Sequence, residues 1–429
     1  MKNYKERIAD ALLKEKLSIM GAVLIVGPKW CGKTTTAEQL AKSVLYIDDP
    51  DSKKQTKELA AIKPRLLLEG ETPRLLDEWQ QTPELWDAVR YEIDHRENNI
   101  GQFILTGSAV PLDNDGKMKI SHSGTGRIAR LTMYPMSLAE SGESSGKISL
   151  GKDLFADNQD ILANNELSLE DIAYLICRGG WPGSLYLNSN LAIKVSKEYV
   201  DAIANVDISR VDDIQRNPEF TKRLLRSYAR NQGAQVPIST FYSDIVNNDN
   251  KSLEEGTITS YINALKKLYV IEDVKSWNPN LRSKTAIRTS DTRYFIDPSI
   301  ATASLGIGPQ DLTNDLSTMG LLFETLVIRD LRVYAESIDG TLYHYRDKSG
   351  LECDAVIHLR NGKYGLIEIK LGGEKNIEDG ATTLKKLNNK IDTDKMLKPS
   401  FMAVITAVGK YAYRREDGIY LVPIGCLKN

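Results

Sequence analysis

Short apolar runs alternate with helical patterns along the first 140 residues of the chain. Five such runs recur at intervals typical of α/β proteins, at residues 20–26, 44–47, 74–76, 103–105 and 128–133. Helical periodicity fills most of the intervals between them; Leu85, Val89 and Ile93, for example, fall on every fourth position. Buried strands that alternate with helices predict a mainly parallel sheet with helices on both faces, so we expect an α/β core over residues 1–140.

The pattern changes after this core. Residues 141–168 are rich in Ser, Gly, Asp and Asn, which predicts a boundary. Residues 169–210 have a helical pattern that is broken by Gly-Gly-Trp-Pro-Gly at 179–183. We therefore expect residues 141–212 to form a linker and a small helical lid.

The remainder divides into two further expected domains. Residues 213–305 contain three helical patterns and end in a strand-like run at 293–297. Residues 306–429 begin with a helix near 320–335 and continue as short strands separated by turns. We expect the former to be a winged-helix-like domain and the latter an α/β domain.

Composition and charge narrow the possible settings of the protein. The 429 residues suffice for about three domains. A formal net charge of −2 gives no whole-molecule attraction to nucleic acid or to an anionic membrane, so such contacts would need a local basic face. No apolar run approaches the roughly 20 residues that cross a bilayer. The four cysteines are Cys31, Cys177, Cys353 and Cys426. They lie far apart in the sequence, which fits neither a disulfide framework nor a zinc site. We expect a cytoplasmic protein with reduced thiols and no membrane anchor.

The string GPKWCGKT at residues 27–34 satisfies the P-loop pattern, with an apolar run before it and a helical pattern after it. In this motif the backbone N–H groups surround the phosphates of ATP, the lysine reaches the β and γ oxygens, and the hydroxyl binds Mg²⁺. Lys33 and Thr34 would have these two roles, and Gly32 would let the backbone approach the phosphates closely. The expected nucleotide-binding residues are Gly27, Pro28, Lys29, Trp30, Cys31, Gly32, Lys33, Thr34 and Thr35.

A second acidic element follows about forty residues later. The apolar run before Asp77 and Glu78 ends in these two carboxylates, as a Walker B strand does. Asp77 would hold Mg²⁺, and Glu78 would orient and deprotonate the attacking water. Acidic residues that merely begin the next helix are the alternative, but the pair at the end of a buried strand favours the catalytic interpretation.

Two further features fit an ATPase site. Thr106, or else Ser108, ends an apolar run where a sensor of the γ-phosphate would lie if that strand neighbours the P-loop strand, although a threonine that satisfies its own turn is the alternative. Arg127, with Arg130 close by, precedes the last run, where ring-forming ATPases present an arginine finger to a neighbour. We hypothesise that Arg127 acts in trans in a homo-oligomer.

Residues 213–305 carry a possible DNA-binding pattern. Two helical stretches joined by a polar turn, at 238–246 and 257–269, are typical of a helix-turn-helix. Basic residues follow them and would form a wing that meets phosphates: Arg282, Lys284, Arg288 and Arg293. Such modules also serve as protein contacts, so the pattern leaves DNA and a protein partner as alternatives.

The last domain contains a candidate metal site. Strand alternation places Glu368 and Lys370 on one face. Together with Asp354 and Glu324 they would form a divalent metal site for phosphodiester cleavage, in which Lys370 activates water. This arrangement resembles the PD-(D/E)xK nuclease core. A strand with solvated charges, or a nuclease-like fold without activity, are the alternatives.

Taken together, these motifs resemble those of prokaryotic ATPases that join an AAA-type domain to a C-terminal region called DUF4143. The resemblance spans nearly the whole chain and rests on the P-loop, LDEWQ at 76–80, LTGS at 105–108, YPMSLAE at 134–140, GGWP at 179–182, GLLFE at 320–324, ECD at 352–354 and EIK at 368–370. It implies an ATP-binding core, a DNA-binding-like middle and a nuclease-like end. We expect ATP hydrolysis that drives or gates an action on DNA; the rival is a nucleotide-dependent switch or scaffold for a protein partner.

Overall fold

The computed structural model describes residues 4–97, 99–107, 123–212, 214–246, 255–279, 290–394 and 396–429. The chain forms two compact units. The first unit comprises Met1–Pro135, Ile203–Asn217 and Tyr261–Tyr269. The second unit comprises Met136–Ala202, Pro218–Ser260 and Val270–Asn429. Each unit therefore contains segments that are distant in sequence.

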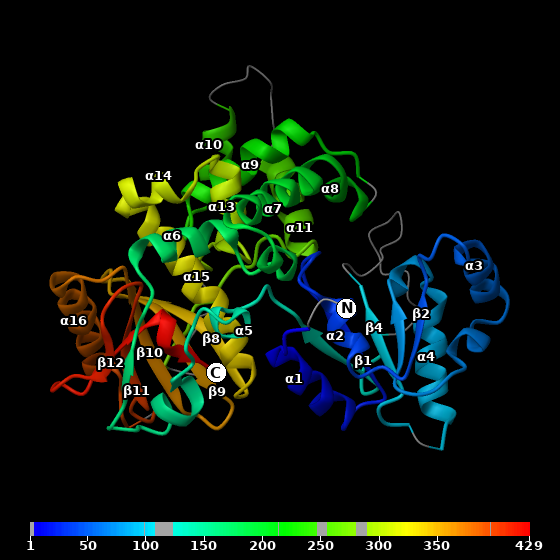
Figure 1. Ribbon diagram of the computed structural model, residues 1–429, viewed down its shortest axis with the longest axis horizontal. Coiled ribbons are helices and arrows are strands. Elements are labelled where there is room, and N and C mark those ends of the chain that lie inside the picture. The colour runs from blue at the N-terminus through cyan, green and yellow to red at the C-terminus, as the bar shows by residue number, and fades with distance from the viewer. Residues whose placement is uncertain are drawn as a thin grey trace. The chain divides into compact units, whose positions relative to one another are not determined.

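A five-stranded sheet in the order β2-β3-β4-β1-β5 forms the centre of the first unit, and every neighbouring pair in it is parallel. Its strands are β1 (Ala22–Val26), β2 (Ser43–Tyr46), β3 (Arg74–Asp77), β4 (Phe103–Thr106) and β5 (Ile128–Thr132). They appear in blue and cyan in Figure 1 together with the helices α1 (Ile8–Leu17), α2 (Lys33–Glu38), α3 (Lys53–Ile62) and α4 (Glu84–His95). Each strand coincides with one of the five apolar runs, so the predicted parallel α/β core is confirmed.

Both faces of β1 are buried, which explains its uninterrupted apolar sequence. Leu24 belongs to a core cluster that contains Val89 of α4, whereas the neighbouring Val23 belongs to another cluster that contains Leu13 of α1. Successive side chains of a strand point to opposite faces, so α1 and α4 cover opposite faces of the sheet.

Helical segments from the middle of the chain complete the first unit. These are Ile203–Asp207, α8 (Ile208–Arg210) and the part of α11 (Glu255–Lys267) that begins at Tyr261. The Asn217 backbone N–H donates to the Tyr261 hydroxyl over 2.8 Å, which ties the end of the segment Ile203–Asn217 to α11. The expected lid over residues 141–212 is thus divided, because its last ten residues lie in the first unit and the rest in the second.

The second unit contains a seven-stranded mixed sheet in the order β7-β12-β13-β11-β10-β9-β8. The strands are β7 (Leu162–Asn164), β8 (Gly340–Arg346), β9 (Glu352–Leu359), β10 (Tyr364–Lys370), β11 (Phe401–Thr406), β12 (Tyr411–Arg414) and β13 (Tyr420–Pro423). Helix α16 (Glu374–Lys390) connects the parallel strands β10 and β11 and packs on the sheet through Leu384 and Leu387. Helix α15 (Leu316–Glu336) contacts β8, β9 and β10.

Residues 141–168, expected as a linker, instead contribute strands to this unit. β6 (Ile148–Ser149) pairs with β14 (Leu427–Lys428), and β7 pairs with β12 at the sheet edge. An edge strand needs only backbone hydrogen bonds, and the side chain of Leu162 is largely exposed. The polar composition therefore gave no signal of this strand, whose partner lies more than two hundred residues later.

The remaining helices of the second unit are α5 (Leu138–Ser141), α6 (Leu169–Arg178), α7 (Ser189–Ala202), α9 (Pro218–Arg230), α10 (Ile238–Val246), α13 (Pro298–Leu305) and α14 (Pro309–Asn314). Helices α9, α10 and α11 match the three predicted helical patterns. Among the described residues, the run at 293–297 contributes an isolated bridge from Phe295 to Ile271, and Asp297 caps α13. The turn at 247–254 lies outside the described residues, and so do three of the four expected wing residues, Arg282, Lys284 and Arg288. The winged-helix interpretation therefore stays a prediction.

A buried charge network joins segments of the second unit that are distant in sequence. Arg329 of α15 donates to Asp297 over 3.0 Å and to Asp330 over 2.8 Å, and all three side chains are almost completely buried. Asp297 also accepts from the Gly180 backbone N–H over 2.9 Å, and Asp330 accepts from the Leu138 backbone N–H over 3.0 Å. Burial raises the pKa of Asp330 to about 6, although Arg329 opposes that shift. The network thus joins residues of the GGWP and YPMSLAE strings to α15 in one core.

None of the helices in the described ranges is both long and apolar enough to span a membrane.

Candidate functional site

The P-loop follows β1 and has a backbone that only glycine allows at two points. Gly27 has φ +145°, and a Cβ on it would lie 2.1 Å from the Met133 carbonyl oxygen. Gly32 has φ +98° and precedes α2. These two positions let the loop turn tightly against the end of β5, as a loop that surrounds phosphate oxygens with its backbone N–H groups must do.

An arginine that the sequence analysis missed anchors this loop. Arg7 is 5% exposed and donates to the Cys31 carbonyl oxygen over 2.9 Å and to the Tyr134 carbonyl oxygen over 2.8 Å. The Cys31 thiol also points toward the Met133 carbonyl oxygen, at 3.6 Å. The N-terminal segment thus holds the middle of the P-loop against the chain after β5. No sequence motif marks Arg7, since its acceptors are backbone atoms.

Lys33 is buried and folds back over its own loop. Its Nζ donates to the carbonyl oxygens of Gly27 and Pro28 over 3.0 and 2.9 Å. Both acceptors are neutral, and no carboxylate in the described part of the chain forms an ion pair with this ammonium. An incoming phosphate would therefore gain a charge-assisted hydrogen bond without breaking an ion pair.

Asp77 lies at the centre of the site. It ends β3, and its Oδ1 accepts from the Thr34 hydroxyl over 2.8 Å and from the Thr106 hydroxyl of β4. Strand β4 lies between β1 and β3, with Thr106 in register with Asp77. The neighbour relation that the sensor hypothesis required of β4 is therefore present. A hydroxyl and a carboxylate in contact are hard oxygen donors of the kind that Mg²⁺ prefers, so the residues fit that ion.

Glu78 follows Asp77 in a left-handed conformation, with φ 56°. It accepts a short hydrogen bond from Gln80 Nε2, and burial raises the pKa of its carboxyl, a shift that the Gln80 bond opposes. Gln80 Oε1 is buried and has no hydrogen-bond partner among the described residues. It packs against Gly107, where a Cβ would lie 2.4 Å away. Glu78 and Gln80 together present one proton acceptor and one free carbonyl oxygen, an arrangement suited to holding a water molecule.

The other predicted loop residues differ in their surroundings. Lys29 Nζ forms an ion pair with Asp207 Oδ1 at 2.7 Å, a contact across 178 positions of the chain that the sequence analysis did not anticipate. Trp30 is 52% exposed and has φ 65°. Thr35 is exposed on α2. Asp207 therefore offsets the charge of Lys29, whereas Trp30 and Thr35 are neutral side chains at the surface.

The arginine-finger candidates lie away from the P-loop of their own chain. Arg127 comes just before β5, where Ile128 pairs with Ala22 at the start of β1, and the P-loop lies at the other end of that strand. Its Nε donates to Asp94 over 2.9 Å. Arg130 donates to the Tyr269 hydroxyl over 2.9 Å. Ser108, the second choice for a sensor, lies outside the described residues.

Three of the four predicted nuclease residues form a direct cluster. Asp354 of β9 and Glu368 and Lys370 of β10 meet on adjacent antiparallel strands. Lys370 Nζ lies 3.2 Å from Asp354 Oδ2 and 2.7 Å from Glu368 Oε2. The Ile369 backbone N–H also donates to Asp354 Oδ2 over 2.7 Å. Gly380 of α16 allows the close approach of that helix, since its Cβ would lie 3.3 Å from Glu368 Cβ.

Glu324 of α15 is the fourth residue, and its carboxylate accepts a short hydrogen bond from the Tyr294 hydroxyl. Burial, followed by the charge of Asp354, raises the pKa of both Glu324 and Glu368 to about 8. Burial alone would lower the pKa of Lys370, but the charges of Asp354 and Glu368 raise it. The cluster thus holds more carboxylates than it has cations to offset them.

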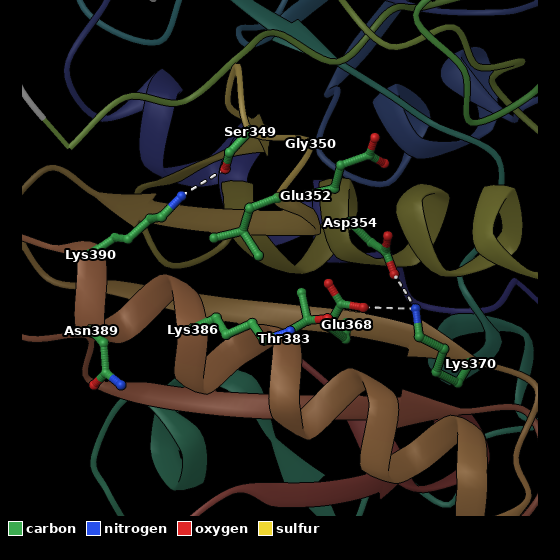
Figure 2. Close-up of a pocket in the computed structure, with 11 residues that line it drawn as sticks. Ser349, Gly350, Glu352, Asp354, Glu368, Lys370, Thr383, Lys386, Asn389 and Lys390 are labelled. Atoms are coloured by element: carbon green, nitrogen blue, oxygen red, sulfur yellow. Dashed lines mark hydrogen bonds and ion pairs between the residues drawn. The ribbon is translucent and has the colours of Figure 1, made fainter.

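The fit of a metal to this cluster is partial. No group of three or more His, Cys, Asp or Glu side chains in the described ranges is arranged to hold a metal ion. Asp354 and Glu368 would supply two oxygen ligands, and a hard cation would take its other ligands from water and substrate. A pocket of about 720 Å³ opens beside these carboxylates (Figure 2). Its lining residues are Ser349, Gly350, Leu351, Glu352, Asp354, Glu368, Lys370, Thr383, Lys386, Asn389 and Lys390.

The strand order of the first unit, its glycine-shaped loop after β1 and its acidic pair after β3 define a P-loop nucleotide-binding protein. Three family models match the chain. One described as an AAA domain covers residues 20–142, a domain of unknown function (DUF8612) covers 169–311, and a domain of unknown function (DUF4143) covers 319–427. The chain is therefore an AAA-type P-loop protein with a C-terminal DUF4143 region.

The relatives and solved structures that resemble this chain have low sequence identity to it. The uncharacterized proteins Rv2008c of Mycobacterium tuberculosis and Mb2031c of Mycobacterium bovis are each 24% identical over 369 residues, 85% of this chain and 74% of theirs. The Walker-type ATPase paby2304 of Pyrococcus abyssi gives a TM-score of 0.41 at 17% identity, over 70% of this chain and 96% of that one. The structure of the replication initiator DnaA bound to AMPPCP and single-stranded DNA gives a TM-score of 0.28 at 16% identity, over 62% of this chain and 89% of that one.

Proposed function

We propose that the first unit hydrolyses ATP with Mg²⁺. The observation that carries this proposal is the contact between the Thr34 hydroxyl of the P-loop and the Asp77 carboxylate that ends β3, directly before Glu78 in the chain. Lys33 would exchange its carbonyl partners for the β and γ phosphates. Thr34 and Asp77 would hold Mg²⁺, which when bound offsets charge on the phosphates.

Glu78 would accept the proton of the attacking water, and Gln80 Oε1 would help to orient that water. Thr106 would report the state of the γ-phosphate through the Asp77 carboxylate that both hydroxyls share. Arg127 would contact the nucleotide of a neighbouring copy, consistent with its position at the opposite end of the sheet from its own P-loop. Release of phosphate from ATP in Mg²⁺ but not in EDTA tests this half of the proposal.

We further propose that the second unit cleaves phosphodiester bonds in DNA. The cluster of Asp354, Glu368 and Lys370 supports this, because two carboxylates and one ammonium can bind a cation and contact a phosphate. Water would attack phosphorus, and one ester oxygen would leave with a proton, which gives a phosphomonoester and a hydroxyl. The charges of Asp354 and Glu368 raise the pKa of Lys370, so this side chain would stay protonated and stabilise charge on the phosphate. The base that activates water would then be a carboxylate or another group, and not Lys370 as the sequence suggested.

Asp354→Ala tests the nuclease half. The wild-type protein should nick plasmid DNA in Mg²⁺ or Mn²⁺, and the rate should change when ATP is added. Asp354→Ala should lower the cleavage rate by at least about 10²-fold, because the variant loses a ligand and a partner of Lys370. Asp394→Ala, which removes an exposed carboxylate elsewhere in the same unit, serves as the control. Equal cleavage by wild type and Asp354→Ala would mean that another site or a contaminant cuts the DNA.

A second function rests on the same cluster. Lys370 already pairs with both carboxylates, so the cluster can be stable without a metal and have a structural role. In that case ATP would set the conformation of a switch that binds a protein partner. Absence of cleavage with every metal, together with intact ATP turnover, would favour this alternative.

A further inference from the structure

The pocket beside the carboxylate cluster has two chemically different ends. Asp354, Glu368 and Lys370 lie toward one end of the view in Figure 2, and Asn389 and Lys390 lie toward the other. The cluster supplies the chemistry of the proposed nuclease, whereas the second end consists of side chains that the cleavage step does not use. Side chains toward this second end could therefore bind another part of a ligand.

Helix α16 presents a polar row along this pocket. Thr383, Lys386 and Asn389 follow one another at intervals of three residues, so they lie on one face of the helix. Gly380 comes one interval earlier and lies against the cluster, with its Cβ position 3.5 Å from Lys370 Cε. A rise of about 1.5 Å per residue puts Lys386 about 9 Å along the helix axis from Gly380. The row thus begins over the cluster and leads away from it.

Lys386 carries the uncommitted positive charge of this row. Lys390 Nζ is held by Asp347 at 2.7 Å and by Ser349 at 2.8 Å, and Lys385, on another face of α16, pairs with Asp417 at 2.7 Å. By contrast, no ion pair or hydrogen bond of Lys386 is found in the described ranges. An ammonium without a partner, flanked by a hydroxyl and an amide, suits a phosphate group and the sugar next to it.

We propose that Lys386, with Thr383 and Asn389, binds the phosphate of a DNA strand that neighbours the phosphate held at Asp354, Glu368 and Lys370. This inference rests on the proposed action of the second unit on DNA and adds how the strand is held. The volume of about 720 Å³ falls in the range of roughly 300–1,000 Å³ typical of ligand pockets, which accommodates a nucleotide unit beside the cluster. The row contacts backbone groups only, so it holds the strand without reading its sequence.

Binding in EDTA tests this site without cleavage. The full chain is titrated against a fluorescently labelled short single-stranded oligodeoxynucleotide, and anisotropy gives the affinity at several salt concentrations. On a single strand, each phosphate contact contributes about 0.7 to the magnitude of the slope of log K against log salt. Lys386→Gln should therefore reduce the magnitude of the slope by about 0.7 and weaken binding. Lys385→Gln makes the same change of charge on the same helix outside the pocket and should leave the slope unchanged.

Competition separates a strand from smaller phosphates. Unlabelled oligonucleotide should displace the probe from the wild-type protein, whereas a 5′-mononucleotide or inorganic phosphate at the same phosphate concentration should not. Equal slopes for Lys386→Gln and Lys385→Gln, or no binding of the oligonucleotide by the wild type, would overturn the proposed site. If the two variants gave equal slopes but cleavage depended on Asp354, only the phosphate site at Lys386 would be wrong. If the slopes differed but the protein did not cleave DNA, only the proposed nuclease activity would be wrong.

Discussion

Glu78→Gln should abolish nearly all ATP turnover and leave ATP binding intact. The substitution removes the proposed proton acceptor but keeps the size of the side chain, and loss of a general base typically costs about 10²–10⁴ in rate. The nucleotide contacts of Lys33 and Thr34 are unaffected, since neither side chain hydrogen-bonds to Glu78. Steady-state phosphate release and equilibrium binding of ATP, measured on the same preparation, separate the two effects.

The control for this variant is Glu84→Gln, which removes an exposed carboxylate from the first turn of α4. It should turn over ATP at the wild-type rate. If Glu78→Gln also retained the wild-type rate, Glu78 would not be the base and the hydrolytic site would have to be sought elsewhere. If it lost binding as well, Glu78 would have a structural role in the loop after β3.

Asp297→Ala should destabilise the second unit by about 3–5 kcal/mol, the cost of leaving a buried charge without one of its partners. Asp297 is completely buried and accepts from Arg329, from the Gly180 backbone N–H and from Ser299. Its removal leaves Arg329 paired with Asp330 alone and leaves the Gly180 N–H without this acceptor. The expected loss is therefore among the largest for a single substitution in this chain.

Hydrogen exchange under native conditions is the suitable measurement, because a chain with two units does not unfold in a single transition. Peptides from α13 and α15 should show the loss of opening free energy. Glu378→Ala provides the comparison, since Glu378 pairs with Arg415 on the surface and is 59% exposed. An exposed pair of this kind contributes little to stability, because water screens both charges. An equally small effect of Asp297→Ala would show that the network is not what holds α13 against α15.

The parallel core was predictable from the sequence because its strands are local and apolar. β1 has five consecutive buried residues, and a strand of that kind is buried on both faces wherever it lies in a sheet. The P-loop was equally clear, since its glycine spacing follows from backbone geometry that few other residues allow. These features depend on neighbours within one short segment of chain.

Contacts between distant segments were not predictable in the same way. Arg7 reaches Cys31 and Tyr134 through backbone acceptors, which leave no trace in side-chain chemistry. The pairing of β7 with β12 depends on backbone hydrogen bonds at an exposed edge. The nuclease-like cluster lies between these extremes, because strand alternation placed Glu368 and Lys370 together, but the ion pairs of Lys370 appear only in three dimensions.

Calorimetry of nucleotide binding tests the central claim most directly. Purified protein with Mg²⁺ and a non-hydrolysable ATP analogue should take up one nucleotide per chain, and Lys33→Ala should bind it about 10–100-fold more weakly, the value of a charge-assisted hydrogen bond. Lys54→Ala, an exposed lysine of α3, should bind as the wild type does. No uptake by the wild-type protein, or equal affinity of Lys33→Ala, would contradict a nucleotide site at residues 27–34.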